Sequence, residues 1–143
     1  MYPVAIVDVS RTLGGAAVLG EAFSDLAGLN VAVGRGFPRG VVRELADHAG
    51  GGALRALVEG LVASPATLKR SPRLSPEASA RAERIARVIA LAEASFDAAE
   101  EARLWLTSVH PMLGVMPIVL SATDLGARQV ERLLHNVAYG LPA

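Results

Sequence analysis

The chain has 143 residues, 52% of them hydrophobic, and its 14 basic and 14 acidic residues cancel. This length fits one compact domain or two small helical modules, and the balanced charge gives no overall attraction for nucleic acid or anionic membranes. The absence of cysteine excludes disulfides, thiolate zinc sites and cysteine nucleophiles. Neither a signal peptide nor a membrane-spanning apolar stretch is visible, so we expect a cytoplasmic protein with no membrane contact.

The N-terminal third is rich in alanine and glycine. Residues 2–9 could form a short strand because of their β-branched content, and a helical or frayed start is nearly as consistent with the sequence. Ser24-Asp25 predicts the start of a helix. The segment Gly34–Pro38 predicts a break, with Pro38 in the first turn of the next helix. The triplet Gly50–Gly52 predicts the end of that helix, since consecutive glycines are costly inside a helix.

The middle of the chain reads as helices separated by serine-proline pairs. A helical stripe covers residues 54–62, and Ser64-Pro65 predicts a short helix that ends before Pro72. These two elements can be drawn as a helix-turn-helix, whose second helix would enter the major groove of DNA. The DNA contacts would then come from Ser64, Thr67, Lys69, Arg70 and Arg73. The alternative is a pair of packed helices with a solvated basic face.

The C-terminal half begins with a stronger helix signal. Ser75-Pro76 predicts a helix that runs to about Ser95, and Asp97 predicts the cap of another helix over residues 98–107. His110 to Pro117 reads as a loop, followed by one helical turn at 117–121. Thr123 or Asp124 then caps a final helix that reaches about Tyr139 and stops at Gly140.

Nothing beyond the first few residues alternates with a period of two, so we predict an all-α fold. We expect an N-terminal helical, helix-turn-helix-like domain over residues 1–74. Residues 75–96 would form a connecting helix, and residues 97–143 a small C-terminal module.

No residue pattern predicts catalysis. His48, His110 and His135 lack the spacing of metal ligands, so we expect no metal and no cofactor. The segment Gly34–Gly40 has the spacing G-x-G-x-x-x-G, one residue longer than the dinucleotide fingerprint, and no acidic residue follows a strand at the expected distance. A nucleotide-binding enzyme is therefore the weaker alternative, and we expect the protein not to be an enzyme.

Several motifs after Pro65 point to one family. The segment "TLKRSPRLSPEASARAERIARV" is followed by "WL", by "HPMLGVMPIVL" and by "GARQVERLL". The chain resembles the Xre/MbcA/ParS antitoxin family in these segments. The matching C-terminal residues are Trp105, Leu106, Pro111, Leu113, Gly114, Pro117, Leu120, Gly126, Ala127, Val130, Leu133, Leu134 and Gly140. His110 and Val115 depart from the common asparagine and second glycine of the loop.

The resemblance implies a partner and a mode of action. The partner would be a cognate RES-domain toxin, an enzyme that degrades NAD or ADP-ribosylates a target, whose active site the C-terminal module occludes. The family also implies a homo-oligomer within a toxin–antitoxin hetero-oligomer, assembled through the N-terminal part. We therefore expect a type II antitoxin, with repression of its own operon by binding operator DNA as the alternative main activity.

The expected toxin contacts lie in the loop, on the exposed side of the last helix and in the tail. Tyr139 is an interface-favoured side chain, whereas Trp105 is expected in the core. The full set is His110, Pro111, Leu113, Gly114, Pro117, Arg128, Arg132, His135, Asn136, Tyr139, Gly140 and Leu141.

Overall fold

A computed structural model describes residues 2–140 of the chain. Within these residues every regular element is a helix, which confirms the predicted all-α fold. None of these helices has the length and apolar character needed to cross a membrane. The elements are α1 (Ile6–Thr12), α2 (Gly15–Leu19), α3 (Leu26–Arg35), α4 (Gly40–His48), the 3-10 turn η1 (Gly52–Leu54), α5 (Arg55–Val62), α6 (Pro65–Arg70), α7 (Pro76–Ser95), α8 (Ala99–Leu106), α9 (Pro117–Leu120) and α10 (Asp124–Ala138).

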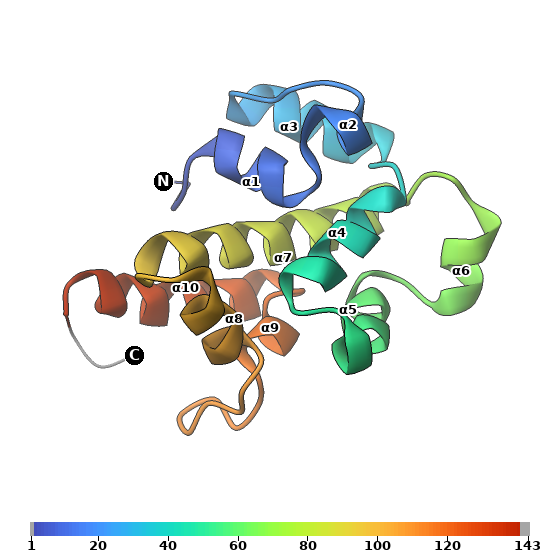
Figure 1. The fold of residues 1–143 in the computed structure, drawn as a ribbon. Coiled ribbons are helices and arrows are strands. Elements are labelled where there is room, and N and C mark those ends of the chain that lie inside the picture. The colour runs from blue at the N-terminus through green and yellow to red at the C-terminus, as the bar shows by residue number, and fades with distance from the viewer. Residues whose placement is uncertain (1, 141–143) are drawn as a thin grey trace.

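The long helix α7 forms the centre of the molecule. It packs against α1, α3, α4 and α5 from the N-terminal half and against α8, α9 and α10 from the C-terminal half. Figure 1 shows α1–α3 above it and α8–α10 below it. Ser75 caps α7 as predicted, its Oγ accepting from the Ala78 amide at 3.1 Å. The segment expected to connect two modules is thus the helix on which both halves pack, and the division into domains stays a prediction.

Small side chains allow the other helices to approach α7 closely. Ala82, Ala86 and Ala92 are fully buried on it, beside Ile85 and Val88. Since alanine and valine fill little space, the core is built from many short contacts between helix backbones rather than from large aromatic rings. This agrees with the low aromatic content of the chain, 4%.

The N-terminal elements follow the sequence signals with one difference, at Pro38. Residues 6–12 are helical, so the helical alternative for the start of the chain is the one observed. Asp25 caps α3, accepting from the Gly28 amide at 2.7 Å. Pro38, predicted in the first turn of the next helix, instead precedes α4 and pairs with Arg73 in an isolated antiparallel bridge. Helix α4 therefore begins only at Gly40.

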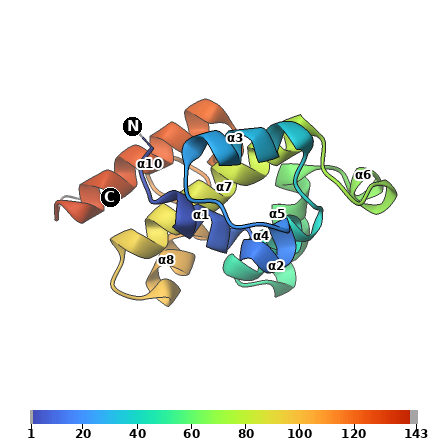
Figure 2. The ribbon, with the colours of Figure 1, turned by 90° about the horizontal axis from the view of Figure 1, so that it is seen from above.

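The glycine triplet after α4 makes the predicted turn. Gly50, Gly51 and Gly52 all have positive φ angles, of 108°, 61° and 55°, a region that other residues enter only with strain. The turn folds α5 back onto α4, and both helices also pack on α7. Figures 1 and 2 show that α6, by contrast, projects away from this bundle.

At the C-terminal end the predicted cap at Asp97 is wrong, and Thr123 is the residue that caps the last helix. Helix α8 begins after Ala98, without a side-chain cap, so Asp97 does not cap it. Thr123, rather than Asp124, caps α10, because its Oγ1 accepts from the Gly126 amide at 3.0 Å. Gly126 also lets α10 meet α9 closely, since a Cβ at this position would overlap the Leu120 carbonyl.

Candidate functional site

A groove of about 750 Å³ runs between α7 and α10. Its lining combines apolar side chains with a charged edge on α10. Leu91 and Ala138 contribute apolar surface, and Arg128, Arg132, His135 and Tyr139 of the predicted contact set also line it. An apolar groove with a few polar groups at its edge is the usual form of a binding site.

The helical period places these four side chains, three on α10 and Tyr139 at its C-cap, on one face. Residues 128, 132, 135 and 139 recur every three or four positions and are exposed, whereas Val130, Leu133 and Leu134 point to the core. The rings of His135 and Tyr139 lie in contact at a tilted angle, with centroids 4.7 Å apart. Arg128 pairs with Asp124 at 3.3 Å. Asn136, also predicted as a contact, is only half-exposed.

A partly buried polar network fixes the position of α10 beside α7. The Arg87 Nε donates to Glu131 Oε1 of α10 at 2.7 Å, and Arg87 Nη1 donates to Glu83 Oε1 at 3.1 Å. The Tyr2 hydroxyl donates to the other Glu83 oxygen at 2.6 Å. Burial, reinforced by the Glu83 carboxylate, raises the pKa of Tyr2, so the phenol stays neutral. We call these four residues the Arg87 network.

Sequence reasoning missed the Arg87 network. The spacing of Glu83 and Arg87, four residues apart on a predicted helix, is a recognisable ion-pair signal. No sequence signal connects either residue to Glu131 or to Tyr2, which lie far away in the chain.

The predicted loop, residues 110–117, is closed by its own backbone. The carbonyl of His110 accepts from the amides of Leu113 and Gly114 at 3.1 and 2.8 Å, and the His110 amide donates to the Val115 carbonyl at 3.0 Å. Gly114 has a φ of 74° and supplies the left-handed residue that the turn requires.

Two members of the predicted contact set are buried in this loop. His110 is 7% exposed and packs edge-on against Trp105, with ring centroids 5.8 Å apart. Pro117 is buried at the start of α9. Both residues therefore shape the loop rather than offer surface to a partner. Trp105, expected in the core, is half-buried between His110 and Phe96.

The structure divides the remaining contact set between two places. Pro111 and Gly114 are exposed on the loop and Leu113 is half-buried there. The predicted contacts from Arg128 to Tyr139, apart from Asn136, line the groove, which no loop residue lines. Gly140 is exposed with a φ of 70° and ends α10 as predicted. Leu141 lies outside the described residues. That any of these residues contacts a toxin stays a prediction.

Most of the residues predicted to contact DNA already form hydrogen bonds within the protein. Ser64 caps α6, and Thr67 receives hydrogen bonds from Ser64 and Arg70. Arg73 donates to the Gly36 carbonyl at 2.7 Å, and Lys69 is exposed. Helix α5 packs on α4 rather than on α6, so residues 54–70 do not form the compact helix pair drawn from the sequence.

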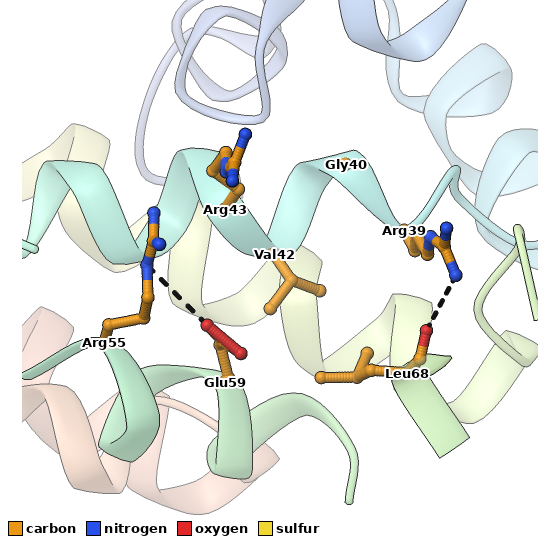
Figure 3. Close-up of a pocket in the computed structure, with 7 residues that line it drawn as sticks. All are labelled: Arg39, Gly40, Val42, Arg43, Arg55, Glu59 and Leu68. Atoms are coloured by element: carbon orange, nitrogen blue, oxygen red, sulfur yellow. Dashed lines mark hydrogen bonds and ion pairs between the residues drawn. The ribbon is translucent and has the colours of Figure 1, made fainter. Parts of the chain in front are cut away.

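A second cleft, of about 400 Å³, lies between α4, α5 and α6 (Figure 3). Arg39, Arg43 and Arg55 line it. Arg39 donates to the Leu68 carbonyl at 3.1 Å and so holds the end of α6 to α4. Arg55 lies near Asp47 and Glu59, at 3.6 and 3.8 Å. The side chains that line the cleft are therefore mainly basic, and the carboxylates of Asp47 and Glu59 partly neutralise the charge of Arg55.

The glycine segment before α4 is not a phosphate loop. Its amides are already used, because Gly36 donates to the Val33 carbonyl, Phe37 to Ser79 Oγ and Arg39 to the Pro72 carbonyl. A phosphate would need such amides free.

The three histidines lie apart from one another. Residues 2–140 contain no cluster of three or more acidic or histidine side chains that could hold a metal ion.

Comparison with known proteins identifies the C-terminal segment. Residues 91–140 match the family model described as the antitoxin Xre/MbcA/ParS C-terminal toxin-binding domain, which confirms the resemblance for this part of the chain. No curated protein matches the chain. The matched segment begins in the last part of α7 and includes the loop, α10 and most of the groove.

Proposed function

Because residues 91–140 carry the toxin-binding domain of the Xre/MbcA/ParS antitoxins, we propose that the protein neutralises a RES-domain toxin by covering its active site. The toxin would be an enzyme that consumes NAD or ADP-ribosylates a target. The antitoxin contributes no catalytic group. It acts by occupying the cleft through which the toxin's substrate must pass.

The match to the toxin-binding domain is the observation that carries this proposal, and the geometry supports it. The groove between α7 and α10 lies almost entirely in the matched segment and is open to solvent. Tyr139 is 70% exposed at its end, and tyrosine is among the side chains that contribute most to protein interfaces. The Arg87 network holds α10 in place, which lowers the ordering cost of binding.

Co-expression with the product of the neighbouring gene tests the proposal. The wild-type chain should restore growth and co-purify with that protein. Combining Tyr139→Ala with Arg132→Glu should weaken the complex by about 30-fold or more, the effect of losing one central interface residue. Arg11→Glu, an exposed arginine on α1, is the matched control and should bind normally. Occlusion is refuted if a chain lacking residues 136–143 still neutralises the toxin.

The basic cleft favours a second candidate function, binding of operator DNA by the N-terminal half. Arg43 is exposed at this cleft and Lys69 is exposed on α6, so both could contact phosphates. A gel shift on the operon's own promoter tests this. Arg43→Ala and Lys69→Ala should each weaken binding and reduce its salt dependence. Absence of a shift at low salt would exclude it.

A further inference from the structure

An exposed apolar tip lies outside the groove, on the loop side of the C-terminal half. Leu104 at the end of α8 is 56% exposed, Val109 is 68% exposed and Met112 is 79% exposed. These three residues fall within nine consecutive positions, and none of them lines the α7–α10 groove. Figure 1 shows the connection between α8 and α9 extending away from the bundle. We call Leu104, Val109 and Met112 the apolar tip.

The backbone beneath the apolar tip is held firmly. Thr107 Oγ1 donates to the Arg103 carbonyl at 2.7 Å and Ser108 Oγ donates to the Leu104 carbonyl at 2.6 Å, which close the end of α8. The Met112 amide donates to Nδ1 of the buried His110 ring at 3.1 Å. The tip therefore presents its side chains from a fixed backbone, and little conformational freedom remains to be lost on binding.

The apolar tip makes no contribution to the core that would explain its composition. A single exposed leucine or valine is ordinary, but three large apolar side chains exposed within nine consecutive residues of one projecting segment favour an interaction surface. Methionine in particular adapts its shape to an apolar pocket. All three residues lie within the segment that matches a toxin-binding domain. This match favours the toxin as the partner that the apolar tip contacts.

We infer that the apolar tip is a hydrophobic anchor that inserts into an apolar pocket on the toxin, separate from the groove contact. The inference rests on the proposed function and adds a second contact region to it. The pocket would be apolar at its base, because the tip carries no charge.

Binding measurements with the full chain test this inference. Val109→Glu and Met112→Glu are compared with Val31→Glu, which changes a valine 58% exposed on α3, and calorimetry measures affinity for the purified product of the neighbouring gene. Each tip variant should bind at least tenfold more weakly, and the α3 control should stay within twofold of wild type. Thermal unfolding by circular dichroism should be unchanged in all three, because the altered side chains are exposed. Met112→Ala, a milder change, should weaken binding in the same direction.

The outcomes separate the two hypotheses. If the wild-type chain binds and the tip variants bind equally well, the anchor is refuted while the proposed function stands. If the wild-type chain does not bind, both fail. If sedimentation shows that the tip variants convert an oligomer of the chain alone into monomers, the tip covers a second copy of the chain, and the inference is overturned.

Discussion

Replacing Arg87 with alanine tests whether the Arg87 network holds α10 against α7. The change leaves the carboxylates of Glu83 and Glu131 without their shared cation, although their side chains are only 14% and 18% exposed. Removing one partner of a buried ion pair costs about 3–5 kcal/mol. Because some solvent reaches these groups, we expect the lower end, about 3 kcal/mol. A domain of this size has a total stability of about 5–15 kcal/mol, so the loss is a large share.

Urea unfolding followed by circular dichroism measures this loss. The matched control is Arg128→Ala, which breaks an ion pair on α10 whose side chains are 70% and 60% exposed and should cost less than about 1 kcal/mol. The melting temperature of Arg87→Ala should fall by about 6–12 °C, at roughly 2–4 °C for each kcal/mol. A loss no larger than that of Arg128→Ala would refute the role given to the network.

Two further predictions concern stability. Glu93 lies 2.8 Å from His48, and this hydrogen bond raises the pKa of the imidazole above its ordinary 6.5. The pair thus stabilises the fold fully below about pH 6.5 and loses its effect as the pH rises through the folded-state pKa. In the variant Glu93→Gln, the urea midpoint of unfolding should therefore change less between about pH 6 and pH 8 than it does in wild type. Gly126→Ala should destabilise by about 1–3 kcal/mol, because its Cβ meets the Leu120 carbonyl. Gly60→Ala, a helical glycine with open space around it, should instead stabilise by about 0.5–1 kcal/mol. A Gly126→Ala urea midpoint no lower than that of wild type, or a Gly60→Ala midpoint no higher, would contradict the corresponding expectation.

Local signals predicted most of the helix boundaries. The caps at Asp25, Ser64 and Ser75 were predictable because a side chain of this type satisfies amides two or three residues away, within its own segment. The glycine turn at 50–52 was predictable for the same reason, since positive φ angles are a local property. These signals require no knowledge of the neighbouring elements in space.

The features that depend on distant partners were not predictable. Pro38 looks like a helix start, yet the backbone around it pairs with residues 72–74, which delays α4. His110 looks like an exposed loop residue, yet it is buried against Trp105, an aromatic contact that spacing does not reveal. In the candidate site, the four exposed α10 residues followed from the helical period, whereas the α7 side of the groove and the Arg87 network required the tertiary structure.

The sharing of α7 by both halves has a consequence for how the protein tolerates changes in length. An α-helix turns by about 100° per residue, so inserting one residue in the middle of α7 would rotate every surface on one side of the insertion relative to the other. The faces that pack on α1, α4, α8 and α10 could not all be restored at once. Length variation between the halves is therefore disfavoured within α7 itself. The number of residues in α7 therefore sets how far the C-terminal groove is rotated about the helix axis relative to the N-terminal surface.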